Sequence, residues 1–508
     1  DFPGTDNLPV WIGDTLYFTS DREDGLLELY ALDLKAAGSA PQRVTKSAPW
    51  DVLWPSGDGR RIVYQSGGWI WLFDPASNQT RRLSIQVQGD LPRTVPYFAN
   101  ATRNILSMGL SPTGKRAVFE TRGEVLTVPA GEGEIRNLTA TPGIREMTPA
   151  WSPDGRWIAY LSDRTGEYEI WVRASDGSEE ERQVTRGGSS WLYPPVWSPD
   201  SRKIAFADKE RRVRYVEVDN GKGEGGRIVD VDKGSLADIT DYRWSPDARW
   251  LAYTKIGSSQ LPSVWVWSVD QKKAWQLTSD MTGEGEPVFD PSGKYIFFLS
   301  NRDFNLTFSG YEFNYLYTDP TRVYAGLLTE DGPALLLPQS DEEPRGEADA
   351  GKEAPKAGGA KGKPEPVRID PDGFERRIRA IPGTPGNYRN LAAGPGAVYY
   401  MVDKDGTPQL RRFDLKEGKE EVILSGLQSY GLSADGQKIL YQQGGTYGVI
   451  DARPGQNPGT GKLPLEKLDI RIDPRAEWNQ MYVDAWRTMR DWFYDPALHG
   501  VDWKGLRE

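Results

Sequence analysis

The chain contains 508 residues, more than one ordinary hydrophobic core accommodates, so we expect two or more domains. A net charge of −11 argues against broad nucleic-acid binding, which needs a basic face, and no apolar run of about 18 residues predicts a membrane span. With no cysteine and a single histidine, His499, the composition excludes disulfides, thiolate nucleophiles and zinc sites built from cysteine or several histidines, so we expect neither metal nor cofactor.

The first 84 residues carry two copies of a strand-rich unit. Residues 11–34 (WIGDTLYFTSDREDGLLELYALDL) and 54–75 (WPSGDGRRIVYQSGGWIWLFDP) each contain short apolar stretches separated by turns with Gly and Asp. Residues 85–100 lack this pattern and carry two prolines, which predicts a crossover between two domains.

The unit is clearest at residues 150–185. Ser152-Pro153-Asp154-Gly155 has the composition of a tight turn, because Pro fixes φ, Asp bonds local backbone and Gly tolerates the exit. Near-alternating apolar stretches flank this turn, and YEIWVRA and ERQVT follow as a third and a fourth strand. One unit therefore comprises four short antiparallel strands.

The unit recurs at a nearly constant period. Its turn proline stands at Pro112, Pro153, Pro199, Pro246 and Pro291, at intervals of 41, 46, 47 and 45 residues. Four strands in roughly 40–45 residues is the period of a β-propeller blade. Weaker copies at 391–415 and 430–452 complete nine units, two before the crossover and seven after it. We predict an all-β chain in which residues 1–84 end a first propeller, whose beginning would precede Asp1, and residues 101–470 form a complete seven-bladed propeller.

Two insertions separate the later units. Residues 301–338 include the aromatic stretch FSGYEFNYLYTDPTRVYAGLL, whose end we expect to finish a blade. Residues 339–366 are Glu, Lys, Ala, Gly and Pro with almost no large apolar side chain, which predicts a flexible surface loop because burial cannot offset its ordering entropy.

From Asp473 the period becomes helical. Asp473 is placed as N-cap and Pro474 as the first helical residue, and we expect the helix to end near Asp495-Pro496. Its apolar stripe at spacings of three and four predicts packing against a domain that starts here, at residues 473–508. The stripe comprises Trp478, Met481, Tyr482, Ala485, Trp486, Met489, Trp492 and Phe493.

These features together resemble the tricorn protease family. The resemblance rests on the blades, on NRDFNLTFSGYEFNYLYTDPTRVYAGLL (301–328), on RIDPDGFERRI (368–378) and on EWNQMYVDAWRTMRDWFYDPALHGVDWKGLRE (477–508). It implies a six-bladed propeller, a seven-bladed propeller, a helical core segment, a PDZ-like domain and a second core segment. It also implies a serine peptidase of S41 type that degrades peptides and assembles into hexamers. We expect the protein to be cytoplasmic.

The resemblance places no catalytic residue in this chain, because the family's catalytic His and Ser follow later in the polypeptide. The chain would gate and guide peptides and support the core, with no nucleic acid or membrane as partner. Two alternatives stay open: a prolyl-oligopeptidase-type peptidase propeller, which predicts alternating strands and helices after the last blade, and a non-catalytic TolB-like scaffold that binds proteins.

Several residues are candidates for a functional role. Arg145, Tyr193 and Arg243 each precede a blade's innermost strand, where a side chain can face the central channel and steer peptide carboxylates; the alternative is ordinary solvated or inter-blade contact. His499 would be a general base or a residue of the turn after the helix, and we favour the turn. Asp154, Asp200 and Asp247 suggest either calcium ligands or turn-forming carboxylates, and again we favour the turns.

Overall fold

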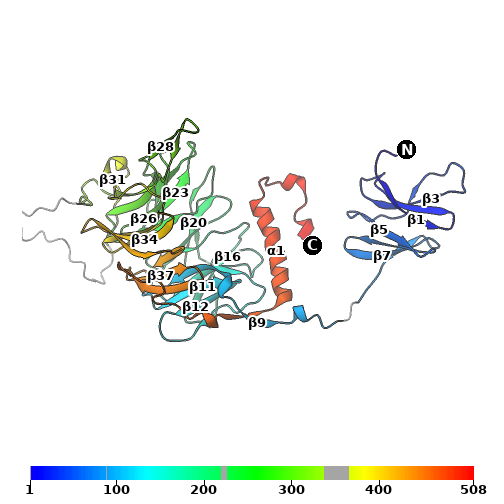
Figure 1. The fold of residues 1–508 in the computed structure, drawn as a ribbon, viewed down its shortest axis with the longest axis horizontal. Coiled ribbons are helices and arrows are strands. Elements are labelled where there is room, and N and C mark those ends of the chain that lie inside the picture. The colour runs from blue at the N-terminus through cyan, green and yellow to red at the C-terminus, as the bar shows by residue number, and fades with distance from the viewer. Residues whose placement is uncertain (1, 87–88, 219–225, 337–364, 508) are drawn as a thin grey trace, which may run out of the picture. The chain divides into compact units, whose positions relative to one another are not determined.

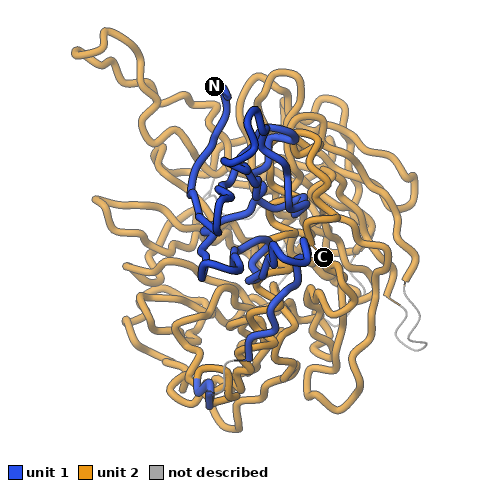
Figure 2. Tube along the Cα trace, turned by 90° about the vertical axis from the view of Figure 1, so that its right-hand side faces the viewer, with its two compact units in different colours: residues 1–92 blue, residues 93–508 orange. Residues whose placement is uncertain are grey.

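The computed structural model describes residues 2–86, 89–218, 226–336 and 365–507. The chain divides into two compact units, residues 1–92 and residues 93–508 (Figure 2). Both units are built from antiparallel sheets, and the one α-helix of the described residues lies in the second unit (Figure 1). No helix in the described ranges is long and apolar enough to cross a membrane.

Unit 1 contains two four-stranded sheets among its described residues. The first sheet consists of β1 (Asp6–Ile12), β2 (Thr15–Ser20), β3 (Glu28–Asp33) and β4 (Gln42–Arg43). The second consists of β5 (Leu53–Gly57), β6 (Ile62–Ser66), β7 (Trp69–Asp74) and β8 (Gln79–Arg82). They share one apolar core, whose buried members are Tyr17, Leu29, Val52, Ile62, Tyr64 and Phe73.

Unit 2 contains seven sheets of the repeat type in its described part, which we call blades 1 to 7. Blade 1 consists of β10 (Ile105–Leu110), β11 (Arg116–Thr121), β12 (Glu124–Pro129) and β13 (Arg136–Asn137). Blade 2 consists of β14 (Glu146–Trp151), β15 (Trp157–Ser162), β16 (Glu169–Ala174) and β17 (Arg182–Gln183). Blade 3 consists of β18 (Val196–Trp197), β19 (Lys203–Ala207), β20 (Arg212–Glu217) and β21 (Ile228–Lys233).

The later blades follow in the same order. Blade 4 consists of β22 (Tyr242–Trp244), β23 (Trp250–Ile256), β24 (Pro262–Ser268) and β25 (Lys273–Gln276). Blade 5 consists of β26 (Glu284–Phe289), β27 (Tyr295–Ser300), β30 (Arg322–Leu327) and β31 (Ile378–Ala380). Blade 6 consists of β32 (Tyr388–Gly394), β33 (Ala397–Lys404), β34 (Thr407–Asp414) and β35 (Lys419–Ser425), and blade 7 of β36 (Ser429–Leu432), β37 (Lys438–Gln443) and β38 (Thr446–Asp451).

The first strands of the blades form a closed ring. Each first strand contacts the first strand of the next blade, from β10 through β14, β18, β22, β26 and β32 to β36, and β36 contacts β10. The apolar cores lie between neighbouring blades; one core, for example, joins Trp157 and Ile170 of blade 2 to Ile204 and Phe206 of blade 3. The all-β propeller class expected from the repeat is confirmed.

The repeated turn is held by its own side chains. The Ser152 hydroxyl donates to the Asp154 carboxylate at 2.6 Å and accepts from the Trp157 amide at 2.9 Å. The described residues contain no group of three or more acidic or His side chains placed to hold a metal. The Asp154 carboxylate also accepts from the Arg156 amide at 3.0 Å, so it is bonded within the turn, as the composition of the turn suggests. The same bonds recur at Ser198 and Asp200 and at Ser245 and Asp247.

Two small sheets lie outside the blades. A hairpin of β28 (Leu306–Ser309) and β29 (Asn314–Tyr317) is inserted between β27 and β30. β9 (Tyr97–Asn100), at the end of the segment expected to be a plain crossover, pairs with β39 (Asp469–Ile472). This pairing joins the strand that precedes blade 1 to the strand that follows blade 7. The predicted flexible loop at about 339–366 lies almost entirely outside the described residues.

The tail helix α1 spans Pro474–Trp492. The Asp473 carboxylate caps it by accepting from the Ala476 amide at 3.3 Å, as predicted from the Asp-Pro pair. The helix ends three residues before the predicted end, because Phe493 has extended backbone angles. The short 3-10 helices are η1 (Pro92–Thr94), η2 (Thr102–Asn104), η3 (Phe374–Arg377), η4 (Leu465–Lys467), η5 (Leu498–Gly500) and η6 (Gly505–Arg507).

Candidate functional site: the central channel and the docked helix

A cavity of about 810 Å³ opens at the hub of the ring. The first strands of blades 3 to 7 contribute to its wall, so it lies where a propeller has its central channel. Its volume falls within the roughly 300–1,000 Å³ range of small-ligand sites. Representative lining residues are Trp197, Arg243, Val288, Ala392 and Leu432.

Arg243 is the basic residue in this wall. Its side chain is exposed, and its Nη1 donates at 2.9 Å to the carbonyl of the adjacent Tyr242. Among the described residues it forms no ion pair within 4.0 Å. Burial raises the pKa of neighbouring Asp241, although hydrogen bonds from Thr254 and the positive charge of Arg243 oppose this effect. The channel thus presents a cation that can interact with an incoming anion.

Hydrogen bonds between blades fix the channel wall. The Asp241 carboxylate of blade 4 accepts from the Glu286 amide of blade 5 at 2.9 Å. The Glu286 carboxylate accepts from the Leu391 amide of blade 6 at 2.6 Å, and the Tyr430 hydroxyl of blade 7 donates to the Asn390 carbonyl at 2.6 Å. A chain of polar contacts therefore connects four consecutive blades around the channel, and none of these residues belongs to a sequence motif.

Two of these contacts are made from backbone bulges, one at Glu286 and one at Asn390. Glu286 and Asn390 have φ of 52° and 54°, in the left-handed region, and each lies where the register of its blade's first strand shifts. A bulge changes the direction of the backbone groups at its residues, here the Glu286 amide and the Asn390 carbonyl. Neither residue is a glycine, so the sequence carries no local signal for these bulges.

The three predicted channel residues occupy different environments. Arg243 lines the cavity. The Tyr193 hydroxyl donates to the Asp238 carboxylate at 2.7 Å, and its pKa is raised by burial and by that carboxylate. Arg145 pairs with Asp484 of helix α1 instead. A channel role thus remains a prediction with geometric support at Arg243. Tyr193 makes an inter-blade contact, as the alternative expects, and Arg145 contacts helix α1, which neither interpretation included.

Helix α1 docks on the loops of blades 1 to 3 mainly through charged groups. Arg487 pairs with Asp163 at 2.7 Å, and both side chains are nearly inaccessible, at 3% and 6% exposure. Arg490 binds both carboxylate oxygens of Glu167 at 2.7 and 2.9 Å. α1 thus lies beside the loop that leads into β16 (Figure 1). Further contacts join Arg122 to Glu477, Tyr168 to Asp484 and the Trp191 amide to Asp491.

The apolar stripe of α1 is left largely uncovered. Only Trp486 of that stripe is buried, and it stacks on Trp503 while each indole N–H donates to the other residue's carbonyl, at 2.8 and 3.1 Å. A second cavity, of about 660 Å³, lies between α1, β39 and the blade loops, with Met481 and Met489 on its wall. Other stripe residues that are about half exposed are Trp478, Tyr482 and Trp492.

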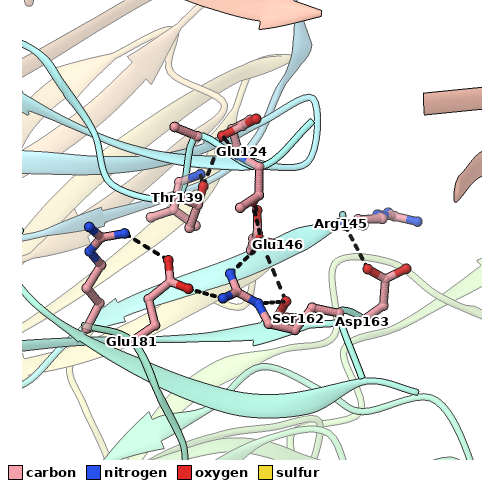
Figure 3. A network of polar contacts seen from close by, with 12 residues as sticks. Glu124, Thr139, Arg145, Glu146, Ser162, Asp163 and Glu181 are labelled. Carbon is pink, nitrogen blue, oxygen red and sulfur yellow. Dashed lines mark hydrogen bonds and ion pairs between the residues drawn. The ribbon is translucent and has the colours of Figure 1, made fainter. Parts of the chain in front are cut away.

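A buried polar network lies between blades 1 and 2, next to the loop between β15 and β16 that contacts α1 (Figure 3). The Glu146 carboxylate accepts from the Thr141 hydroxyl at 2.8 Å and from Arg164 at 3.1 Å. Burial, reinforced by the charge of Glu124, raises the pKa of Glu146 to about 8. Asp163 belongs to the same turn as Arg164, so this network adjoins the helix contact.

His499 stands in the turn after α1, as the favoured interpretation predicts. Its Nε2 lies 2.5 Å from the Tyr494 hydroxyl, and its side chain is 60% exposed. The ring contacts Phe493 and Tyr494. The imidazole Nε2 is thus hydrogen-bonded to the phenol of Tyr494 and not to a serine.

Comparison with known proteins identifies the architecture. A family model described as the tricorn protease second beta propeller domain matches residues 105–453, and one described as the tricorn protease C1 domain matches residues 474–508. Tricorn protease homolog 1 of Streptomyces coelicolor is 27% identical, over 99% of this chain and 48% of its own length. The tricorn protease homolog of Saccharolobus solfataricus is 24% identical, over 97% and 44%.

The fold agrees with a solved structure. The crystal structure of the tricorn protease matches with a TM-score of 0.73 and 17% identity, over 99% of this chain and 47% of that one. The chain spans about half the length of the relatives that it matches. Because the propeller family model covers well over half of its residues, the chain belongs to the tricorn protease family.

Proposed function

We propose that this chain is the propeller part, with the first core helix, of a serine-type peptidase that degrades peptides. In this proposal the seven-bladed ring admits and guides peptides, α1 connects the ring to the catalytic core, and the catalytic residues lie outside residues 1–508. The full protein would be a cytoplasmic homo-oligomer. The match to the C1 domain behind the propeller favours this function over a prolyl-oligopeptidase-type enzyme or a TolB-like scaffold.

The observation that carries the guiding role is the exposed Arg243 on the wall of the hub cavity. Every unmodified peptide ends in a carboxylate, and a cation in a narrow channel attracts such a group. Two wall carboxylates, Asp241 and Glu286, already accept backbone amides of the next blade. Their charge is thereby partly compensated, whereas the cation stays available to a ligand.

Peptide binding to the purified chain tests this role. We expect Arg243→Ala to weaken binding of a short peptide about tenfold, or ~1.4 kcal/mol, when its carboxyl terminus is free, and to leave binding of the amidated peptide unchanged. Arg379→Ala is the matched control, because this exposed arginine lies on the outermost strand of blade 5. Equal affinities of the wild-type chain for the free and the amidated peptide would contradict the proposal.

A further inference from the structure

The hairpin β28–β29 presents one continuous apolar face. Leu306 lies opposite Tyr317 and Phe308 opposite Tyr315. Because side chains alternate along a strand, these four residues share one face. Phe308 also contacts Phe313 and Tyr315, with ring centroids 6.5 and 5.6 Å apart. The hairpin projects from blade 5 (Figure 1).

This face is exposed to solvent. Its six large side chains are between 41% and 80% accessible. Side chains of this size offer roughly 600 Å² per copy at that exposure, so two copies reach the ~1,200 Å² lower limit of stable protein interfaces. A patch this large on a water-soluble protein normally marks an interaction site. The six residues are Phe304, Leu306, Phe308, Phe313, Tyr315 and Tyr317.

The charge of the hairpin permits a contact between two copies of the chain. Between residues 304 and 318 the only charged side chain is Glu312, whereas the whole chain carries −11. The net charges of two copies repel one another, but this nearly uncharged face adds little to that repulsion. The other face of the hairpin bears Thr307, Ser309 and Asn314 beside a single large apolar residue, Leu316, so the continuous apolar surface lies on one face only.

The hairpin also lacks the features that prevent association. Neither strand contains a proline, a lysine or a bulge, which are the devices that natural edge strands use against pairing. A two-stranded hairpin is only marginally stable in water without a partner layer. A second hairpin, stacked at the usual ~10 Å between sheets, would supply that layer.

We propose that the aromatic face of β28–β29 joins two copies of this chain, hairpin on hairpin, about a twofold axis. A twofold axis brings the same patch of both copies together, so the contact closes on itself. The contact is separate from the hub cavity, and the outcome for one does not decide the outcome for the other.

Mass measurement by analytical ultracentrifugation provides the first test. We expect the double variant Phe308→Ser/Tyr315→Ser to lose the dimeric contact and to show about half the mass of the corresponding wild-type species. Leu316→Ser, on the opposite face of the same hairpin, should keep the wild-type mass. Hairpin residues 304–317 lie outside the blade cores, so circular dichroism should show both variants folded.

The absence of cysteine allows a second test. Pyrene attached to Phe313→Cys replaces one aromatic group by another and should give excimer fluorescence when two hairpins stack. Pyrene on Thr307→Cys, which faces away, should not. Unchanged mass in the double variant together with absence of excimer emission would overturn the proposal. If the double variant instead lost peptide binding at unchanged mass, the occupant would be a peptide and the proposal would be wrong.

Discussion

Glu146 is fully buried between blades 1 and 2, where its carboxylate and that of Glu124 both accept from Thr141. Two carboxylates so close to one another in a buried site cannot both ionise without cost. Arg164 and Ser162 also face Glu146 and favour its charged form, but burial dominates and raises the pKa to about 8. The folded protein therefore holds a proton here at pH values where the unfolded chain has lost it.

The sign of the pH dependence follows from this shift. Between the ordinary Glu value near 4.5 and about 8 the folded state binds more protons, so Glu146 makes the free energy of unfolding fall as pH rises, by up to ~1.4 kcal/mol per pH unit. Glu146→Gln should show a shallower decline between pH 5 and 8, measured from urea unfolding midpoints. Parallel curves for the variant and the wild type would contradict this assignment.

At the residue scale, sequence predicted what depends on neighbours along the chain. The turn aspartates and the Asp473 cap were predictable because their partners lie within five residues. The partners of Arg145 and Glu286 were not, because they come from elements 339 and 45 residues away, and no local pattern encodes such a pairing.

The docking of α1 belongs to the scale of single elements. Sequence predicted the helix and the packing of its apolar stripe against the domain that starts at residues 473–508, but it did not indicate how the helix contacts the propeller. The propeller binds mainly the opposite, charged side of the helix, and of the stripe it contacts Trp492 through Trp191 and Lys209. Most of the stripe is exposed. The hydrophobic pattern identifies a face that will be buried but does not identify the first partner to cover it, because charged pairs leave no periodic signal.

We expect Arg487→Ala to release α1 from the propeller. Breaking a buried ion pair by removing one partner costs about 3–5 kcal/mol, since Asp163 would remain buried without its cation. Amide hydrogen exchange in residues 474–492 should accelerate about 100-fold or more, while exchange in β15 stays as in the wild type. Arg475→Ala, at an exposed position of the same helix, is the control. Unchanged exchange in α1 would show that the apolar cavity wall holds the helix by itself.

At the scale of the whole molecule, the repeat predicted the sheets and the ring that they form. Most blades are local units of about 45 residues, and stacking such similar units leaves few alternatives. The pairing of β9 with β39 could not be predicted, because residues 97–100 and 469–472 stand at opposite ends of unit 2 and show no shared pattern. The unpredicted contacts are thus those made outside the repeat, by β9 with β39 and by α1 with the blade loops.

Because the proposal places the catalytic residues outside residues 1–508, it predicts that this chain alone hydrolyses no peptide. Serine catalysis requires a histidine that accepts the proton of a serine hydroxyl. The one histidine, His499, is exposed and its Nε2 is bonded to the Tyr494 hydroxyl, with Asp495 at 3.5 Å from Nδ1. Incubation with fluorogenic peptides should give no turnover, and a fluorophosphonate probe for activated serines should label nothing.

His499→Ala separates residual activity from contamination. A trace rate that the variant retains would come from another protein in the preparation. A rate that His499→Ala abolishes would place a general base inside this chain, and the proposal that the propeller only guides substrates to catalytic residues elsewhere would then fail. Peptide binding should be the same in His499→Ala and in the wild type, because His499 lies outside the residues that line the hub cavity.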